Sequence, residues 1–195
     1  MTASTLGPVV WAIGVIAWFI SRYPYARRAR RTQTVRSVGT ARERTLLVGA
    51  FLGLFGIPIF YLITGWPRAA GYPLNVVAVG LGAAIFVASL WLFRRSHKDL
   101  GRQWSASLEI RNEHRVVRSG VYSRIRHPMY ASFWLWALAQ AFLLPNAVAA
   151  FSGLLFVGIL FFARVRHEEQ MLINALGEDY RVYMGETKRI IPGVY

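Results

Sequence analysis

The hydrophobic residues of this chain are gathered into five long blocks, and polar, mostly basic segments separate them. A helix that crosses a bilayer needs about 20 predominantly apolar residues. The blocks therefore predict five membrane-spanning helices, of which the first and fourth are short. These predicted spans cover residues 6–20, 46–66, 74–93, 129–144 and 147–163. No basic stretch precedes the first block and no small-residue cleavage site follows it, so we expect a retained span rather than a signal peptide.

The basic residues are distributed unevenly among the connecting segments. Residues 21–45 contain eight arginines and one acidic residue, Glu43, and residues 94–128 contain nine Lys or Arg. The connection 67–73 contains only Arg68. Short loops that are rich in Lys and Arg stay on the cytoplasmic side. This alternation predicts an amino terminus outside and a carboxyl terminus inside.

Composition agrees with a membrane protein and excludes several other classes. Of the 195 residues, 55% are hydrophobic, which is too apolar for a disordered chain. The formal net charge of +14 would point to nucleic acid in a soluble protein. Here the basic residues lie in the connecting segments, where they determine the orientation of the spans in the membrane. We therefore expect membrane lipids, and no nucleic acid, as partners. The absence of cysteine excludes disulfides, thiolate catalysis and cysteine-ligated metals.

These observations predict an all-α, multi-pass integral membrane protein with a single domain, residues 1–195. Residues 1–93 would supply three spans. Residues 94–195 would supply the last two spans, a cytoplasmic C-terminal helical cap and the functional site, which would face the cytoplasm. In a prokaryote the membrane would be the plasma or inner membrane.

The first candidate segment, residues 97–130, leads into the fourth predicted span. Pro128 lacks an amide hydrogen and has a preset φ, so it suits the first turn of that helix. Arg126 and His127 would then lie beside the unpaired amides of a helix start, a plausible anchor for a carboxylate or phosphate. The alternative is an ordinary membrane-interface boundary, where Arg, His and Tyr also gather.

The second candidate segment, residues 164–177, follows the fifth predicted span. It has the pattern of a helix that ends at Gly177, with Arg164 and Glu168 on one face. Such a pair is often a simple surface ion pair. However, Glu168 and Glu169 emerge where a helix leaves the bilayer, and ionisable groups are costly there unless they are paired or used. A cationic ligand would be attracted to them.

A short connection near Pro145 would bring both segments to the same membrane face. An anion anchor beside a cation anchor would suit S-adenosylmethionine, which carries a sulfonium, an ammonium and a carboxylate. Rings of Tyr122, Tyr130 or Trp104 could pack against it. The residues alone do not require this ligand. The four histidines show no paired metal-ligand spacing, so we expect no metal site.

These motifs resemble the isoprenylcysteine carboxyl methyltransferase family, in particular a short, five-span prokaryotic-type member. The resemblance rests on an ordered set of residues in the carboxyl-terminal half. The set consists of Leu100, Gly101, Trp104, Ser105, His114, Val117, Gly120, Val121, Tyr122, Arg126, His127, Pro128, Met129, Tyr130, Arg164, Glu168, Glu169, Gly177, Glu178, Asp179 and Tyr180.

The resemblance implies a membrane-embedded S-adenosylmethionine-dependent methyltransferase in which Arg164 and Glu168 are catalytic. Arg164 would bind the substrate, a lipophilic small molecule or lipidated acceptor that presents a carboxylate. Glu168 would hold the ammonium end of the cofactor. The implied cofactor-binding residues are His114, Arg115, Val116, Val117, Tyr122, His127, Pro128, Met129, Tyr130 and Glu168. A carboxylate is already a nucleophile, so positioning and desolvation would supply most of the acceleration.

Three alternatives stay open at this point. Motifs like the Arg-His-Pro-x-Tyr segment at residues 126–130, taken alone, occur in related phospholipid N-methyltransferases and thiol S-methyltransferases, so the acceptor atom is not fixed. They also occur in nicotinamide-dependent membrane reductases, although adjacent carboxylates would repel the phosphates of that cofactor. A non-enzymatic transporter or assembly factor is disfavoured, because the predicted spans lack the ionisable residues that coupled transporters usually need. The sequence does not indicate an oligomeric state.

Overall fold

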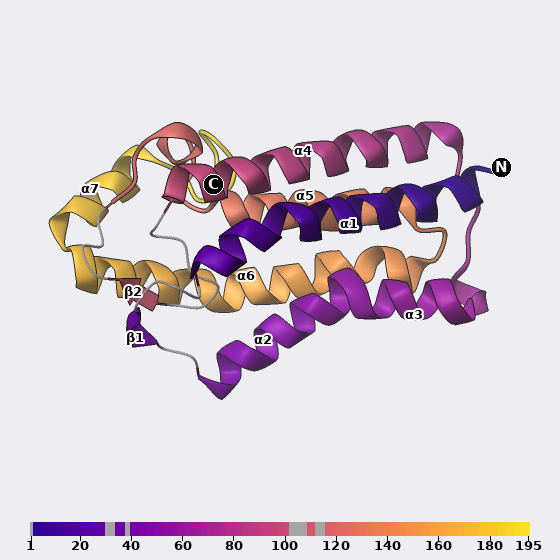
Figure 1. The fold of residues 1–195 in the computed structure, drawn as a ribbon, viewed down its shortest axis with the longest axis horizontal. Helices are drawn as coiled ribbons and strands as arrows, with labels where there is room; N and C mark the ends of the chain where they lie inside the picture. The colour runs from indigo at the N-terminus through magenta and orange to yellow at the C-terminus, as the bar shows by residue number, and fades with distance from the viewer. Residues whose placement is uncertain (1, 30–33, 38–39, 102–108, 112–115) are drawn as a thin grey trace.

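The fold is a bundle of long helices that run alongside one another (Figure 1). The computed structural model describes residues 2–29, 34–37, 40–101, 109–111 and 116–195. The helices are α1 (Ala3–Ala29), α2 (Ala41–Phe51), α3 (Ile57–Thr64), α4 (Val76–Leu100), α5 (Pro128–Leu143), α6 (Ala147–Leu176) and α7 (Glu178–Glu186). Short helical turns are η1 (Leu52–Gly56), η2 (Arg68–Ala70) and η4 (Gly120–Ser123).

Among the described residues, four helical segments are long and apolar enough to cross a membrane. They are Ala3–Arg27, Ala41–Thr64, Val76–Leu100 and Ala147–Leu176. They correspond to the first, second, third and fifth predicted spans. The second of them is one helical run in which the π-helical turn η1 joins α2 to α3.

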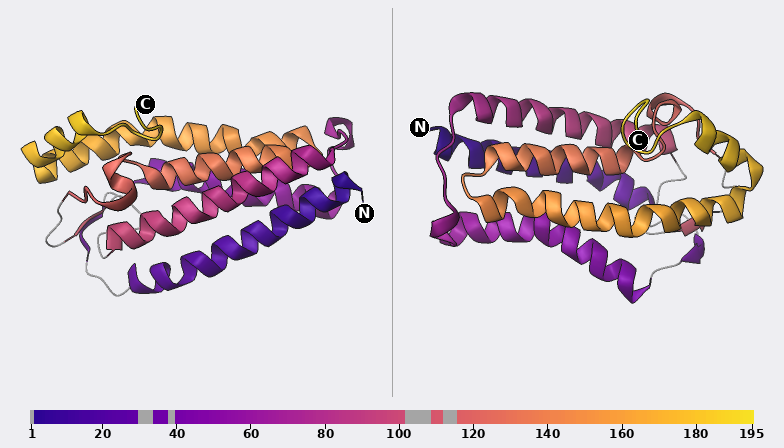
Figure 2. Two further views of the ribbon diagram at one scale, coloured as in Figure 1. Left: turned by 90° about the horizontal axis from the view of Figure 1, so that it is seen from above. Right: turned by 180° about the vertical axis from the view of Figure 1, so that it is seen from behind.

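Helix α5 coincides with the fourth predicted span but is shorter than a typical spanning helix. Its 16 residues extend about 24 Å at about 1.5 Å per residue, whereas the hydrocarbon core is about 30 Å thick. It lies between α4 and α6 in the bundle (Figure 2). Ser89 of α4 donates a hydrogen bond to the carbonyl of Ser132 in α5 at 2.7 Å.

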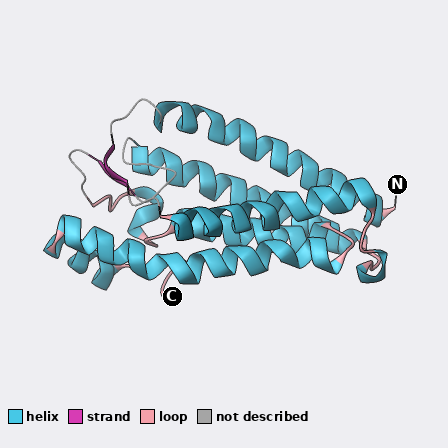
Figure 3. Ribbon diagram, turned by 90° about the horizontal axis from the view of Figure 1, so that it is seen from below, coloured by secondary structure: helices cyan, strands magenta, loops and turns pink. Residues whose placement is uncertain are grey.

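A small antiparallel ribbon, which the hydrophobic pattern does not predict, joins two of the basic connecting segments. Strand β1 (Thr34–Ser37) pairs with β2 (Glu109–Arg111), with Ser37 opposite Glu109. Figure 3 shows it as the short magenta element of an otherwise helical fold. Strands of four and three residues are too short to show a hydrophobic periodicity, so the hydrophobic pattern predicts helices alone.

The helix boundaries follow local rules. Asn75 and Asn146 cap α4 and α6, because each side-chain oxygen accepts a hydrogen bond from the amide three residues later. Pro128 begins α5, and Gly177, with φ of 60°, ends α6. The predictions for Pro128 and Gly177 are confirmed.

Aromatic rings fill the interior of the bundle. Trp18 packs at 5.2 Å from Trp136 and 5.3 Å from Phe93, measured between ring centroids. In contrast, many large apolar side chains face outward, including Ile20, Ile63 and Val87. An exposed apolar surface of this extent marks contact with lipid or another apolar partner.

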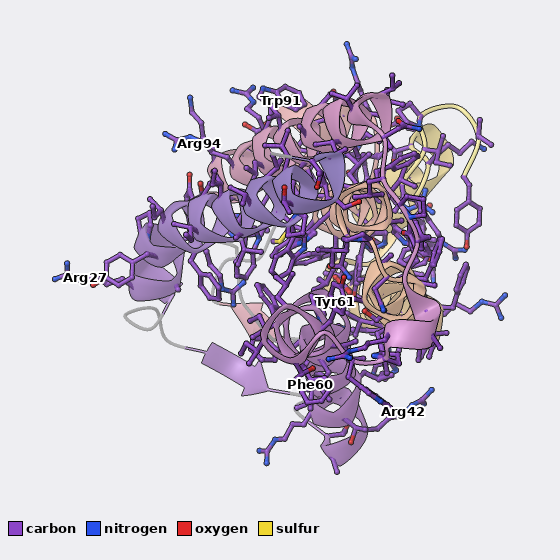
Figure 4. The ribbon with its side chains drawn as sticks, turned by 90° about the vertical axis from the view of Figure 1, so that its right-hand side faces the viewer. Arg27, Arg42, Phe60, Tyr61, Trp91 and Arg94 are labelled. Atoms are coloured by element: carbon purple, nitrogen blue, oxygen red, sulfur yellow. The ribbon has the colours of Figure 1, made fainter. Side chains whose placement is uncertain are left out.

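Most of the polar segments gather at one end of the bundle, which we call the polar end. Helices α1, α4 and α6 finish there, α2 and α5 begin there, and the ribbon and α7 lie beside it (Figure 1). The view along the helices in Figure 4 shows Arg27, Arg42 and Arg94 projecting outward from the bundle. The two candidate segments therefore share one end of the molecule.

Candidate active site

The start of α5 lies directly against the polar half of α6. The hydroxyl of Tyr130 donates a hydrogen bond of 2.9 Å to Oε2 of Glu168. One position further along α6, Oε1 of Glu169 lies 3.2 Å from Nε2 of His127. The predicted meeting of the two candidate segments is therefore confirmed.

Arg164 lies between two carboxylates. Its Nε is 3.7 Å from Oε2 of Glu168, which confirms the expected pair along one face of α6. Its Nη2 is 3.2 Å from Oε1 of Glu43 in α2. The Arg164 and Glu43 side chains are only 11% and 6% exposed. The contact with Glu43 was not predicted, although a lone acid among eight arginines is a signal that could have indicated it.

Glu169 has a different environment from its neighbour. Its carboxylate, 4% exposed, lies 3.1 Å from Nη2 of Arg126 and 2.7 Å from Nη2 of Arg189, in addition to its contact with His127. We call these four residues the Glu169 cluster. Hydrogen bonds to Glu169 raise the pKa of the Arg189 guanidinium above its usual value.

The Glu169 cluster changes the interpretation of the two anchors. Arg126 and His127 were expected to attract an anion, and Glu169 to share a cation with Glu168. In the structure Arg126 and His127 instead contact the Glu169 carboxylate, because a buried charge is stabilised by a nearby partner. Glu168, 23% exposed, is the more accessible carboxylate of the adjacent pair.

Residues after α7 support this cluster through the backbone. The amide of Arg126 donates to the carbonyl of Lys188 at 2.7 Å, and the amide of His127 donates to that of Arg189 at 2.9 Å. The Arg126 guanidinium also donates to the carbonyls of Met184 and Thr187. The residues that precede α5 are thereby held on two sides. No local sequence pattern indicated this pairing.

Tyr122 is held in the turn η4 beside the same end of α5. Asp99, near the end of α4, accepts a hydrogen bond of 2.9 Å from the amide of Val121. Tyr183 of α7 donates its hydroxyl hydrogen to the carbonyl of Tyr122 at 2.6 Å. Burial raises the pKa of the Tyr122 phenol above its usual value, and the neighbouring Tyr183 and Glu168 add to this effect.

The described candidate residues thus occupy one neighbourhood. Pro128 is buried in the first turn of α5, Met129 is half-buried, and Val116 and Val117 are half-buried ahead of η4. His114, Arg115, Trp104 and Ser105 lie outside the described residues. Within the described ranges, no three His, Asp or Glu side chains are grouped so that they could hold a metal ion.

This arrangement offers two complementary groups to a ligand. Glu168 is a fixed, partly exposed carboxylate that can bind a cation, and Arg164 is an oriented guanidinium that can bind an anion. Because neighbouring residues contact both side chains, the two groups are already oriented before a ligand binds.

Parts of this chain are similar in sequence to known proteins. The family model described as "Isoprenylcysteine carboxyl methyltransferase (ICMT) family" matches residues 70–174. The protein-S-isoprenylcysteine O-methyltransferase of Schizosaccharomyces pombe is 34% identical over 80 residues, which are 41% of this chain and 34% of that protein. The human enzyme of the same name is 36% identical over 81 residues, which are 42% of this chain and 28% of that protein.

A further relative, protein-S-isoprenylcysteine O-methyltransferase B of Arabidopsis thaliana, is 31% identical over 96 residues, or 48% of this chain and 49% of that protein. The matches thus span half or less of the length of these relatives. A solved structure of the eukaryotic intramembrane Ras methyltransferase ICMT superposes with a TM-score of 0.54 at 20% identity, covering 80% of this chain and 55% of that one. This likeness concerns the fold.

Proposed function

This chain belongs to the isoprenylcysteine carboxyl methyltransferase family, and on that premise we propose that it is a membrane-embedded S-adenosylmethionine-dependent methyltransferase. The methyl group would go to a lipophilic acceptor, small or lipidated, through a carboxylate. The observation that carries the proposal is the position of Arg164 and Glu168, a cation and a carboxylate 3.7 Å apart at the polar end.

In the proposed site, Glu168 binds the ammonium of the cofactor and Arg164 orients the acceptor carboxylate. S-adenosylmethionine supplies a methyl group on a positively charged sulfur. Tyr130 restrains the Glu168 carboxylate through its hydroxyl. An acceptor carboxylate needs no general base, so Arg164 has only to direct one of its oxygens and exclude water. Arg164 and Glu168 are thus the proposed catalytic residues.

The charge and chemistry of the described residues support this cofactor. The partly exposed Glu168 carboxylate accepts a hydrogen bond from the hydroxyl of Tyr130 and is among the groups that raise the pKa of Tyr122, and both tyrosines are buried. Aromatic faces attract cations such as a sulfonium. The proposed cofactor-binding set is His114, Arg115, Val116, Val117, Tyr122, His127, Pro128, Met129, Tyr130 and Glu168, within a cofactor-binding half formed by residues 94–195.

We also propose a five-span arrangement in which α5 is the short fourth span. The polar end would face the cytoplasm, with the amino terminus outside and α7 as part of a C-terminal cap. The basic residues around this end support the orientation, because positively charged segments are retained in the cytoplasm. A lipophilic acceptor would then reach Arg164 sideways from the bilayer.

The test is titration calorimetry of the detergent-solubilised protein with S-adenosylhomocysteine, with a reduced nicotinamide cofactor as the comparison ligand. We expect saturable binding of S-adenosylhomocysteine alone. Glu168→Ala should abolish it, whereas Glu178→Ala, which removes an exposed glutamate of α7 paired with Arg181, should not. Binding of the nicotinamide cofactor alone would replace this proposal with a reductase.

The acceptor class requires a separate measurement. Transfer of a labelled methyl group to an S-prenylated cysteine with a free carboxylate would support O-methylation. Transfer only to a phospholipid amine or a lipophilic thiol would keep the cofactor assignment and change the acceptor atom.

A further inference from the structure

Glu43 links the amino-terminal helices to the proposed site. It lies in α2, outside residues 70–174 that match the family model. Its Oε1 is 3.2 Å from Nη2 of Arg164, and both side chains are nearly buried. We propose that Glu43 is a positioning residue that holds the Arg164 guanidinium in the direction needed for acceptor methylation. This inference rests on the function proposed above.

The geometry supports a positioning role because carboxylates from two different helices lie beside two separate nitrogens of the guanidinium, at ion-pair distance and, among the described residues, without a hydrogen bond at Nε. Glu168 lies at Nε and Glu43 at Nη2. A guanidinium is planar, so carboxylates beside two of its nitrogens restrict the directions in which the third nitrogen, Nη1, can point. With Glu168 alone, the ion pair would be a single contact within one helix, and Arg164 could rotate about its long side chain.

The backbone of α2 is itself anchored at this point. The hydroxyl of Thr40 caps the helix by accepting a hydrogen bond of 3.2 Å from the amide of Glu43. Ahead of Thr40, strand β1 pairs with β2, which precedes the proposed cofactor strip at residues 114–117. The Thr40 cap therefore fixes the backbone of Glu43 in the first turn of α2.

The charges around Arg164 predict an effect of removing Glu43 on the kinetics that differs from the effect of unfolding. Two carboxylates flank one guanidinium, so removing one negative charge strengthens the attraction of Arg164 for an acceptor carboxylate. The same change releases the orientation of Nη1. Turnover should therefore fall while the acceptor KM stays the same or decreases, which unfolding or loss of a binding pocket would not produce.

The experiment compares the wild type with Glu43→Gln, Glu43→Asp and the control Glu178→Gln, which alters an exposed glutamate in α7. The acceptor probe is N-acetyl-S-farnesylcysteine, a small prenylated cysteine with a free carboxylate. We expect Glu43→Gln to lower kcat by about tenfold to hundredfold, as small misplacements of reacting groups do. The acceptor KM should not rise, and S-adenosylhomocysteine affinity should stay within about twofold, since the altered contact is not to the cofactor. Glu43→Asp should recover part of kcat.

A second readout does not depend on turnover. With S-adenosylhomocysteine bound, phenylglyoxal modification of Arg164, measured by peptide mapping, should be several times faster in Glu43→Gln than in the wild type or Glu178→Gln. Unchanged modification of Arg164 overturns the positioning role, as does an unchanged kcat or a parallel loss of cofactor affinity. A wild-type protein that binds no S-adenosylhomocysteine would instead overturn the proposed function, which separates the two failures.

Discussion

The two adjacent glutamates of α6 should respond oppositely to the same substitution. Glu169→Gln removes the negative charge that Arg126 and Arg189 share and that His127 contacts. Glu168→Gln removes a partly exposed carboxylate that contacts Arg164 and Tyr130. We expect the first substitution to reduce stability and the second to reduce cofactor binding.

The magnitude for Glu169 follows from its burial. Removing one partner of a buried ion pair costs about 3–5 kcal/mol, because the remaining charge stays desolvated without compensation. The glutamine oxygen still accepts hydrogen bonds, so we expect the lower end, about 3 kcal/mol. For a chain of this size, such a loss lowers the Tm by roughly 6–12 °C. Glu168→Gln should lower the Tm by much less, since Arg164 keeps its contact with Glu43.

The assay is thermal unfolding of both variants in one detergent without ligand, followed by calorimetric titration with S-adenosylhomocysteine at a temperature where both are folded. Glu169→Gln should unfold early but bind the ligand when folded, and Glu168→Gln should show the reverse. The reasoning is refuted if Glu169→Gln leaves the Tm unchanged, or if Glu168→Gln is the less stable of the two.

Three further outcomes test other parts of the structure. Arg164→Lys should retain S-adenosylhomocysteine binding and lose most acceptor methylation, because a single ammonium cannot bridge Glu43, Glu168 and an acceptor carboxylate. An equal loss of binding and of methylation would contradict this. Gln140→Leu should lower the free energy of unfolding by about 1–2 kcal/mol in thermal unfolding, because the buried amide accepts a hydrogen bond from Trp11 and donates to the carbonyls of Gly53 and Ala149. An unchanged stability would contradict this. Gly14→Val should weaken packing of α1 on α4 by about 1–3 kcal/mol, because even a Cβ there would lie 2.4 Å from the Phe86 ring; an unchanged Tm would refute it.

The sequence predicts those features that depend on neighbouring residues. Hydrophobic blocks located every long helix, Pro128 and Gly177 located two helix ends, and the short turn at Pro145 brought α5 beside α6. These signals are local, because a bilayer, a fixed φ or a positive φ constrains residues that are close together in the chain.

The contacts of the charged side chains were not predictable in the same way. Glu43 and Arg164 are far apart in the chain, as are Arg126 and Glu169, and no periodicity relates them. Burial decides such pairs, since a charge taken out of water needs whichever counterion the fold brings near. The sequence therefore indicated which residue types gather at the polar end but not which of them neutralise one another.

Helix geometry explains why two consecutive glutamates have separate roles. Successive residues of a helix point in directions about 100° apart, so Glu168 and Glu169 cannot face the same neighbour. Glu168 lies one turn after Arg164 and shares its face, where it remains partly exposed. Glu169 points toward the start of α5 and Arg189, where it is buried. The cluster around Glu169 stabilises the fold from which Glu168 and Tyr130 project, and Glu168 itself remains available to a ligand, so the two carboxylates separate stability from binding.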